Sequence, residues 1–161
     1  SRGRMILEGL NEDYRDLLIL FADAGVEYVI VGAYALAFHG APRASGDIDL
    51  FVRPTPANAE RVFAALQRFG APLDAAHVTA QDFARQASVY QIGLPPRRID
   101  ILTEISGVTF EEAWASRDRG EMDGREVSLI GRAALLRNKE ATGRLKDRAD
   151  AARLRRSDTG I

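Results

Sequence analysis

The 161-residue sequence has no cysteine and only two histidines, His39 and His77. These absences exclude disulfides and thiolate zinc sites, so a metal bound here should be a hard cation with oxygen ligands. No apolar run approaches the roughly 20 residues that span a bilayer, and the first residues lack the apolar core of a signal peptide. We therefore expect a cytoplasmic protein with no membrane partner.

Neither positive nor negative charge is in clear excess, because the formal net charge is -1. This balance argues against a surface covered with positive charge for non-specific nucleic-acid binding. A hydrophobic content of 46% and a charged content of 28% are typical of a globular chain. We interpret residues 1–4 as a leftover of cloning and 5–161 as a single domain, with a core at about 26–131 and a helical tail at about 132–156.

Apolar periodicity and turn residues predict alternating helices and short strands. The expected helices are 11–24, 33–39, 57–69, 109–116, 132–142 and 144–156, and the expected strands are 28–31, 47–52, 89–94, 98–102 and 126–130. Strands 89–94 and 98–102 should form a hairpin through Pro95 and Pro96. The predicted fold is α+β or α/β, a mixed sheet of four to five strands flanked by helices with a helical C-terminal section.

Three acidic residues interrupt apolar strands. Asp47 and Asp49 are one residue apart, so on a strand their side chains share a face about 6 to 7 Å apart at the backbone. Asp100 lies in a similar apolar run and is expected to converge on them. Carboxylates this close repel one another, so we expect a bound cation or an arginine beside them. Carboxylates suit Mg²⁺, with Mn²⁺ as the other option, and a pair of such ions serves in-line displacement at phosphorus.

Residues upstream of the acids suit a phosphate group. Gly32 and Ala33 place backbone N–H groups at the start of a helix that directly follows a strand. Arg43 has a planar fork of donors that matches phosphate oxygens, and Ser45 carries a hydroxyl beside it. The sequence thus predicts phosphate binding between this turn and the acids.

The order of these residues resembles the DNA polymerase beta-like nucleotidyltransferase superfamily, particularly its minimal bacterial members. The resemblance is carried by Val31-Gly32-Ala33, Asp47-Ile48-Asp49-Leu50 and Ile99-Asp100-Ile101, and it extends from about 29 to 154. Pro42-Arg43 and the tail from Asn138 to Asp150 look like stand-alone domains related to abortive-infection toxins. One position departs, because Ala33 stands where the superfamily has Gly or Ser.

The resemblance implies an Mg²⁺-dependent enzyme that moves an NMP from an NTP to an acceptor hydroxyl and releases pyrophosphate. Asp47, Asp49 and Asp100 would be catalytic and hold two Mg²⁺ ions, and Asp100 would also help to deprotonate the acceptor. It implies nucleotide binding by Gly32, Ala33, Arg43 and Ser45 and by three tail residues, Lys139, Arg144 and Lys146. The acceptor, whether small molecule, tRNA or protein, stays open.

Other interpretations of the same residues remain open. Asp47 and Asp49 could mark a solvated strand start, Asp100 could pair with Arg97 or Arg98, and Arg43 could pair with Asp47 or Asp49. The tail charges could be an ordinary solvated surface; Lys139, Gly143, Lys146 and Asp150 share one helical face only if the two tail helices run on with little break.

Two other functions also fit the sequence. One is a catalytically weak nucleotide-sensing module, which Ala33 favours. The other is a toxin of a toxin–antitoxin pair that acts on tRNA or protein and has an antitoxin partner. Its substrate would contact a short basic surface made of Arg132, Arg137, Arg144 and Arg148.

Overall fold

The computed structural model describes residues 6–7, 11–43 and 46–159. Within them one mixed sheet has seven strands in the order β1-β6-β7-β2-β3-β5-β4. The strands are β1 (Ile6–Leu7), β2 (Tyr28–Val31), β3 (Ile48–Val52), β4 (Val89–Ile92), β5 (Ile99–Leu102), β6 (Asp118–Met122) and β7 (Arg125–Leu129). The α-helices are α1 (Glu12–Ala24), α2 (Gly32–Phe38), α3 (Pro56–Phe69), α4 (Phe110–Ala115), α5 (Arg132–Ala141) and α6 (Leu145–Thr159), and η1 (Ala80–Ala84) is a 3₁₀-helix.

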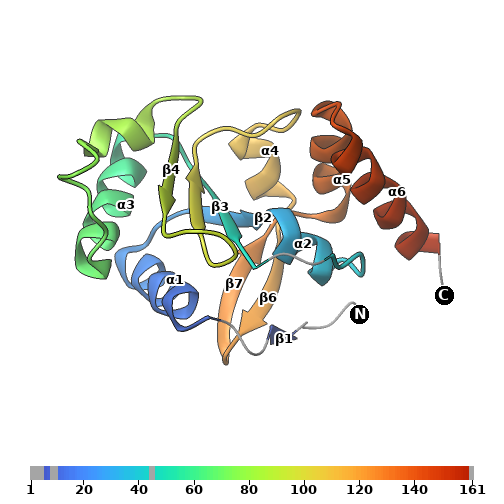
Figure 1. The fold of residues 1–161 in the computed structure, drawn as a ribbon, viewed down its shortest axis with the longest axis horizontal. Helices are drawn as coiled ribbons and strands as arrows, with labels where there is room; N and C mark the ends of the chain where they lie inside the picture. The colour runs from blue at the N-terminus through green and yellow to red at the C-terminus, as the bar shows by residue number, and fades with distance from the viewer. Residues whose placement is uncertain (1–5, 8–10, 44–45, 160–161) are drawn as a thin grey trace.

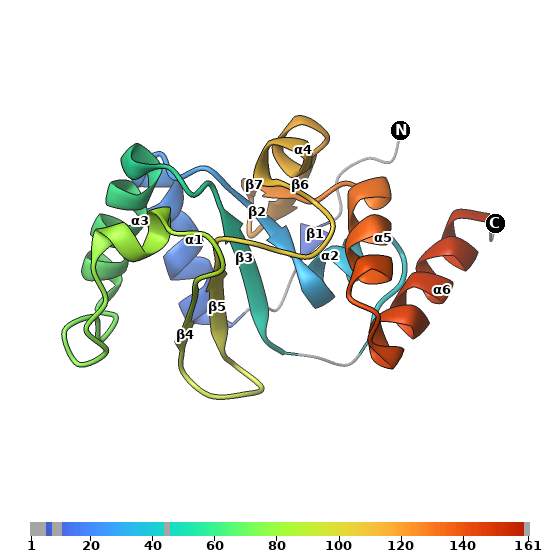
Figure 2. The same ribbon diagram turned by 90° about the horizontal axis from the view of Figure 1, so that it is seen from above.

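Side chains alternate between the two faces of the central strands, and each face packs on different helices. Ile48, Leu50 and Val52 of β3 share one core cluster with residues of α1 and α3. Phe51, on the other face of β3, belongs to a second cluster with residues of α4, α5 and α6. Figure 2 shows α1 and α3 to one side of the central strands and α5 and α6 to the other. Asp49 is two residues from Phe51 and therefore faces the α4 and α5 side.

Local signals explain where the longer helices begin and end. Asn11 accepts a hydrogen bond from the Asp13 N–H before α1, and Gly25 ends the helix at a φ of 72°. Thr55 and Pro56 begin α3, and Gly70 ends it at a φ of 91°. These predicted helices are confirmed, and the apolar residues of both belong to one buried cluster with residues of the sheet.

The mixed sheet flanked by helices is confirmed, and it is larger than predicted. All five expected strands are present, and β4 and β5 form the expected antiparallel hairpin. Two strands, β1 and β6, were not predicted. The β6 segment, Asp118–Met122, has no apolar alternation, and its centre is Gly120. A Cβ there would lie 2.7 Å from Leu129 Cδ1, so close packing on glycine takes the place of a hydrophobic signal.

The two C-terminal helices are separate and pack against each other, as Figure 1 shows for α5 and α6. Gly143 lies between them with a φ of 73°, a left-handed conformation that stops the first helix. Consequently the tail charges do not share one helical face: Lys139 is buried, whereas Lys146 is exposed. No helix in the described part of the chain is long and apolar enough to cross a membrane.

Candidate active site

The site is built on two adjacent parallel strands, β3 and β5. Their register pairs Asp49 with Asp100, so these two acidic residues are direct neighbours across the sheet, with backbones about 4.8 Å apart. Asp47 precedes β3 on the same face. The expected approach of Asp100 to the first two acids is therefore present. Residues about 50 positions apart in the sequence meet only because the two strands pair in this register.

The electrostatics of Asp49 reflect this crowding. Burial and the adjacent Asp100 carboxylate raise the pKa of Asp49 to about 7, while the Lys139 ammonium acts in the opposite direction. Asp47 adds a smaller repulsion. Among the described residues no lysine, arginine or histidine nitrogen forms an ion pair with Asp49. The Asp49–Asp100 pair thus carries negative charge that a bound cation would neutralise.

Glycine is required beside Asp49. Val31 of β2 pairs with Asp49, and Gly32 follows it at a φ of 71°. A Cβ on Gly32 would lie 2.1 Å from Asp49 Oδ2. The carboxylate therefore rests directly against the backbone at the start of α2, which no other residue at position 32 would permit. Ala33 follows, and its side chain is buried.

Arg98 connects the other two acids. Its backbone N–H donates to Asp47 Oδ1 at 2.9 Å, and its Nη2 lies 3.5 Å from Asp47 Oδ2. Its Nε and Nη2 donate to the two oxygens of Asp100 at 2.7 and 3.1 Å. Asp100 therefore lies beside Asp49 and also pairs with Arg98, one of the two arginines that the sequence offered as its partner. Asp47 is not a solvated strand start.

A cavity of about 280 Å³ opens in front of Asp49. Its lining includes Gly32, Asp49, Glu104, Lys139, Arg144 and Asp147, which come from β2–α2, β3, the segment after β5, and the C-terminal helices. Of the three predicted tail residues, the structure brings Lys139 and Arg144 to Asp49, whereas Lys146 is exposed and does not line this cavity.

The cations beside the cavity are held by two buried acids of α6. Lys139 Nζ lies 3.1 Å from Asp147 and 3.2 Å from Asp150. Arg43 pairs with Asp150 at 3.2 Å and Arg144 with Asp147 at 2.7 Å. Arg43 therefore does not pair with Asp47 or Asp49, which corrects that alternative. The pairing also shows that the tail charges are not simply a solvated surface.

Asp147, which contacts both Lys139 and Arg144, is strongly stabilised in its charged form. Burial alone would raise the pKa of Asp147, but hydrogen bonds from Thr142 and Lys139, the Lys139 charge and a bond from Arg144 lower it to about 2. An anion entering the cavity would therefore meet cations whose positions are already fixed.

Two other predictions about basic and polar residues have different outcomes. Arg132, expected on a basic surface, is half-buried and donates to the carbonyl oxygens of His39 and Leu154. It is therefore committed to packing α5 against its neighbours, and the proposed four-arginine surface loses that member. Ser45 lies outside the described residues.

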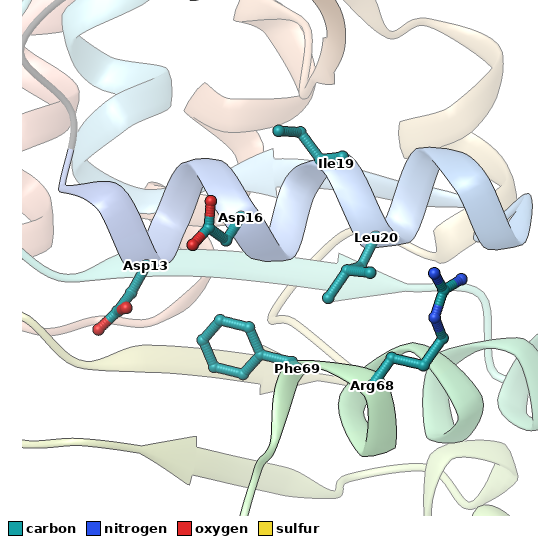
Figure 3. Close-up of a pocket in the computed structure, with 6 residues that line it drawn as sticks. All are labelled: Asp13, Asp16, Ile19, Leu20, Arg68 and Phe69. Carbon is teal, nitrogen blue, oxygen red and sulfur yellow. The ribbon is translucent and has the colours of Figure 1, made fainter.

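A separate groove lies on the opposite side of the sheet, between α1 and α3. Figure 3 shows its lining, Asp13, Asp16, Ile19, Leu20, Arg68 and Phe69, and its volume is about 490 Å³. It is larger than the cavity at Asp49, but none of the residues predicted to be functional lines it. Size therefore does not identify the candidate site; the acidic strand pair does.

Comparison with known proteins agrees with this geometry at the level of the fold. No family model and no curated protein sequence matches the chain. Among solved structures, the lincosamide antibiotic adenylyltransferase LnuA, lincomycin-bound, matches with a TM-score of 0.52 and 14% sequence identity. The match covers 91% of this chain and 97% of that one. The chain has a nucleotidyltransferase fold.

In this fold, the donor set at the acids suits a divalent cation. No group of three or more His, Cys, Asp or Glu side chains in the described residues is arranged to hold an ion unaided. Asp49 and Asp100 nevertheless give two adjacent hard carboxylates, and Asp49 lacks an ion-pair partner among the described residues. Mg²⁺ commonly takes one or two protein carboxylates, with water and substrate phosphates as its other ligands. The residues present therefore fit such an ion.

Sequence reasoning missed part of this site. Glu104 and Thr142 were not singled out, and Asp147 was not recognised as a partner of Lys139. For Glu104 a weak signal existed, since it is an acid placed just after the end of the strand that carries Asp100. Nothing in the sequence places Asp147 against Lys139, because the contact depends on the angle at which α6 leaves Gly143.

Proposed function

We propose that this protein is a nucleotidyltransferase that moves a nucleoside monophosphate from an NTP to an acceptor hydroxyl group. One observation carries the proposal: Asp49 and Asp100 are paired across β3 and β5, beside Gly32, in front of a cavity that Lys139 and Arg144 also line. The shared fold of an antibiotic adenylyltransferase supports it.

In this proposal Asp47, Asp49 and Asp100 hold divalent cations. The cations would neutralise the phosphate oxygens and stabilise charge that develops during transfer. Gly32 leaves the backbone open to the triphosphate, and Lys139, Arg144 and Arg43 supply positive charge to it. The acceptor oxygen attacks the α-phosphorus, the bond to the bridging oxygen breaks, and pyrophosphate leaves. The hydroxyl proton passes to Asp100.

The acceptor class rests on analogy alone. The structural neighbour is described as a lincosamide antibiotic adenylyltransferase, with lincomycin bound. Since one fold serves many substrates, this supports small hydroxylated molecules as the first acceptors to test and does not select one among them.

The test is a transfer screen. The purified protein is incubated with each of the four NTPs, labelled at the α-phosphate, together with Mg²⁺ and pools of hydroxylated small molecules, tRNA or protein. We expect label transfer and pyrophosphate release with at least one pool, and neither with Asp47→Asn. Transfer that is equal in wild type and Asp47→Asn would overturn the proposal. Label on tRNA or protein, with slow growth on expression that Asp49→Ala abolishes, would favour the toxin alternative.

A nucleotide-binding module without turnover is the second candidate. Two observations favour it: Ala33 supplies no hydroxyl for a phosphate, and Arg98 already binds Asp47 and Asp100. Calorimetric titration with Mg²⁺ and NTP, run beside the pyrophosphate assay, separates the two functions. Binding with no release across all acceptor pools would select the module, and release with any pool would exclude it.

A further inference from the structure

We propose that Arg98 is a built-in counter-ion that competes with a divalent cation for Asp47 and Asp100. This inference rests on the proposed function, because it describes how part of the negative charge of the same acidic site is balanced before metal and nucleotide bind. It assigns a role to a residue that is neither a metal ligand nor a phosphate ligand in the proposal above.

Arg98 contacts every carboxylate oxygen of Asp47 and Asp100. Each of the four carboxylate oxygens of Asp47 and Asp100 has an Arg98 nitrogen within 3.5 Å: one the backbone N–H, the others Nε and Nη2. Asp49 has no such partner among the described residues. The three acids are therefore unequal: Asp47 and Asp100 share one cationic partner within the chain, and Asp49 is left facing the cavity.

The chain holds Arg98 in place through its backbone. The Arg98 carbonyl oxygen accepts from the Ile48 N–H at 3.0 Å and from the Tyr14 hydroxyl at 3.2 Å. Arg98 is two residues before Asp100, so both side chains project from the same face of the strand and meet without backbone movement. The Arg98 side chain is 26% exposed, whereas that of Asp100 is 10% exposed, so Arg98 lies nearer to solvent than its partner.

Competition follows from the chemistry of the two cations. A guanidinium is weakly hydrated and binds a carboxylate through a fork of two donors. Mg²⁺ gives up its water reluctantly and needs room for several oxygen ligands. Without nucleotide, Arg98 should therefore retain Asp47 and Asp100. Added triphosphate charge shifts the balance towards the divalent cation, which frees the side chain of Arg98 to turn towards solvent.

Metal binding in the absence of nucleotide tests this directly. Mn²⁺ is titrated into wild type, Arg98→Gln and Arg97→Gln, with free Mn²⁺ measured by electron paramagnetic resonance. Arg97 is exposed and adjacent, and so gives a matched loss of charge. We expect Arg98→Gln to bind Mn²⁺ more tightly by about two- to five-fold, or to bind one more ion, because removing one competing ion pair is an effect of that order. Arg97→Gln should match wild type.

Equal or weaker Mn²⁺ binding by Arg98→Gln would overturn the proposal. Arg98→Lys, which keeps the charge but loses the fork, should bind Mn²⁺ with intermediate affinity. If Arg98→Gln is unfolded without metal, restoration of its circular dichroism by Mn²⁺ supports the proposal, and no response counts against it.

The outcome is separable from that of the proposed function. Tighter Mn²⁺ binding by Arg98→Gln with no nucleotide transfer by wild type would refute the enzyme and keep the counter-ion. Transfer by wild type with unchanged Mn²⁺ binding in Arg98→Gln would do the reverse.

Discussion

Gly32 is the residue whose replacement should damage the site most selectively. An added Cβ would lie 2.1 Å from Asp49 Oδ2, so Gly32→Ala must displace the carboxylate. Gly25→Ala is a matched control, because Gly25 also has a positive φ, 72°, but nothing lies within 4 Å of its Cβ position. Both variants should lose about 1–2 kcal/mol of stability from the left-handed backbone. Only Gly32→Ala should also weaken NTP binding, by about ten-fold or more.

Equilibrium binding of Mg·NTP, together with urea unfolding, measures both effects. If Gly32→Ala and Gly25→Ala bind nucleotide equally well, the close approach of Asp49 to the backbone has no functional role.

Asp49 should make stability depend on pH. Burial, followed by the Asp100 charge, raises its pKa to about 7, whereas an aspartate in an unfolded chain titrates near 4. The folded protein thus keeps a proton that the unfolded chain has released, so this contribution to stability is full below pH 4 and is lost as pH rises through 7. Asp49→Asn should therefore be more stable than wild type at pH 8.5 by about 1–3 kcal/mol, and this gain should vanish near pH 4.

Urea denaturation at the two pH values, in a chelator, measures this difference. Adding Mg²⁺ at pH 8.5 should stabilise wild type and leave Asp49→Asn unchanged, because the cation replaces the missing positive charge. If the difference in stability between wild type and Asp49→Asn does not change with pH, burial and the Asp100 charge do not raise the pKa of Asp49.

At the scale of elements, α5 and α6 place cations at the cavity. Lys139 and Lys146 are the only lysines of the chain, and they make a matched pair: the first is buried against Asp147 and Asp150, and the second is exposed. Lys139→Met should cost about 2–4 kcal/mol, because it leaves buried carboxylates short of a partner. Lys146→Met should stay within about 0.5 kcal/mol of wild type.

Thermal unfolding followed by circular dichroism gives both values. Similar melting temperatures for the two variants would mean that Arg43, Arg144 and Arg153 neutralise the two acids without Lys139.

Elements with a local signal could be predicted from the sequence, and elements that depend on packing could not. The central strands β2 and β3 are apolar, and α1 and α3 have apolar periodicity and clear caps. All four occur as expected. β6 is charged and has Gly120 at its centre. Its position depends on the close packing of Gly120 against Leu129 and Phe38, which the sequence does not show. The meeting of Lys139 with Asp150 likewise depends on the turn at Gly143, which spacing along one helix cannot describe.

At the scale of the whole molecule, the sheet order explains how distant acids converge. Asp49 and Asp100 belong to strands separated in sequence by α3, η1 and β4, yet β3 and β5 are neighbours. Sequence reasoning anticipated this meeting because all three acids interrupt apolar strands, and because their order resembles a known superfamily. It offered Arg98 as a partner of Asp100, which the structure confirms, but it did not anticipate that the same arginine also contacts Asp47. The resemblance concerns the positions of the three acids. The positive charge beside Asp47 and Asp100 comes from Arg98, which is not part of that resemblance.

The fold tolerates extensive change in sequence. The match to the adenylyltransferase structure covers 91% of the chain at only 14% identity. At that distance the fold is shared while the substrate is free to differ, so the residues of the cavity, rather than the fold, must decide what is bound. Experiments on the cavity residues are therefore more informative than further comparison of the fold.

The most direct measurement is calorimetric titration of Mg²⁺ with each of the four NTPs into wild type, Asp49→Asn and Asp23→Asn. Asp23 is exposed on α1 and controls for the loss of one carboxylate. Wild type and Asp23→Asn should bind at least one NTP with the same affinity, and Asp49→Asn should bind it at least about ten-fold more weakly. Binding that Asp49→Asn leaves unchanged, or no binding of any NTP by wild type, would contradict the assignment of this site.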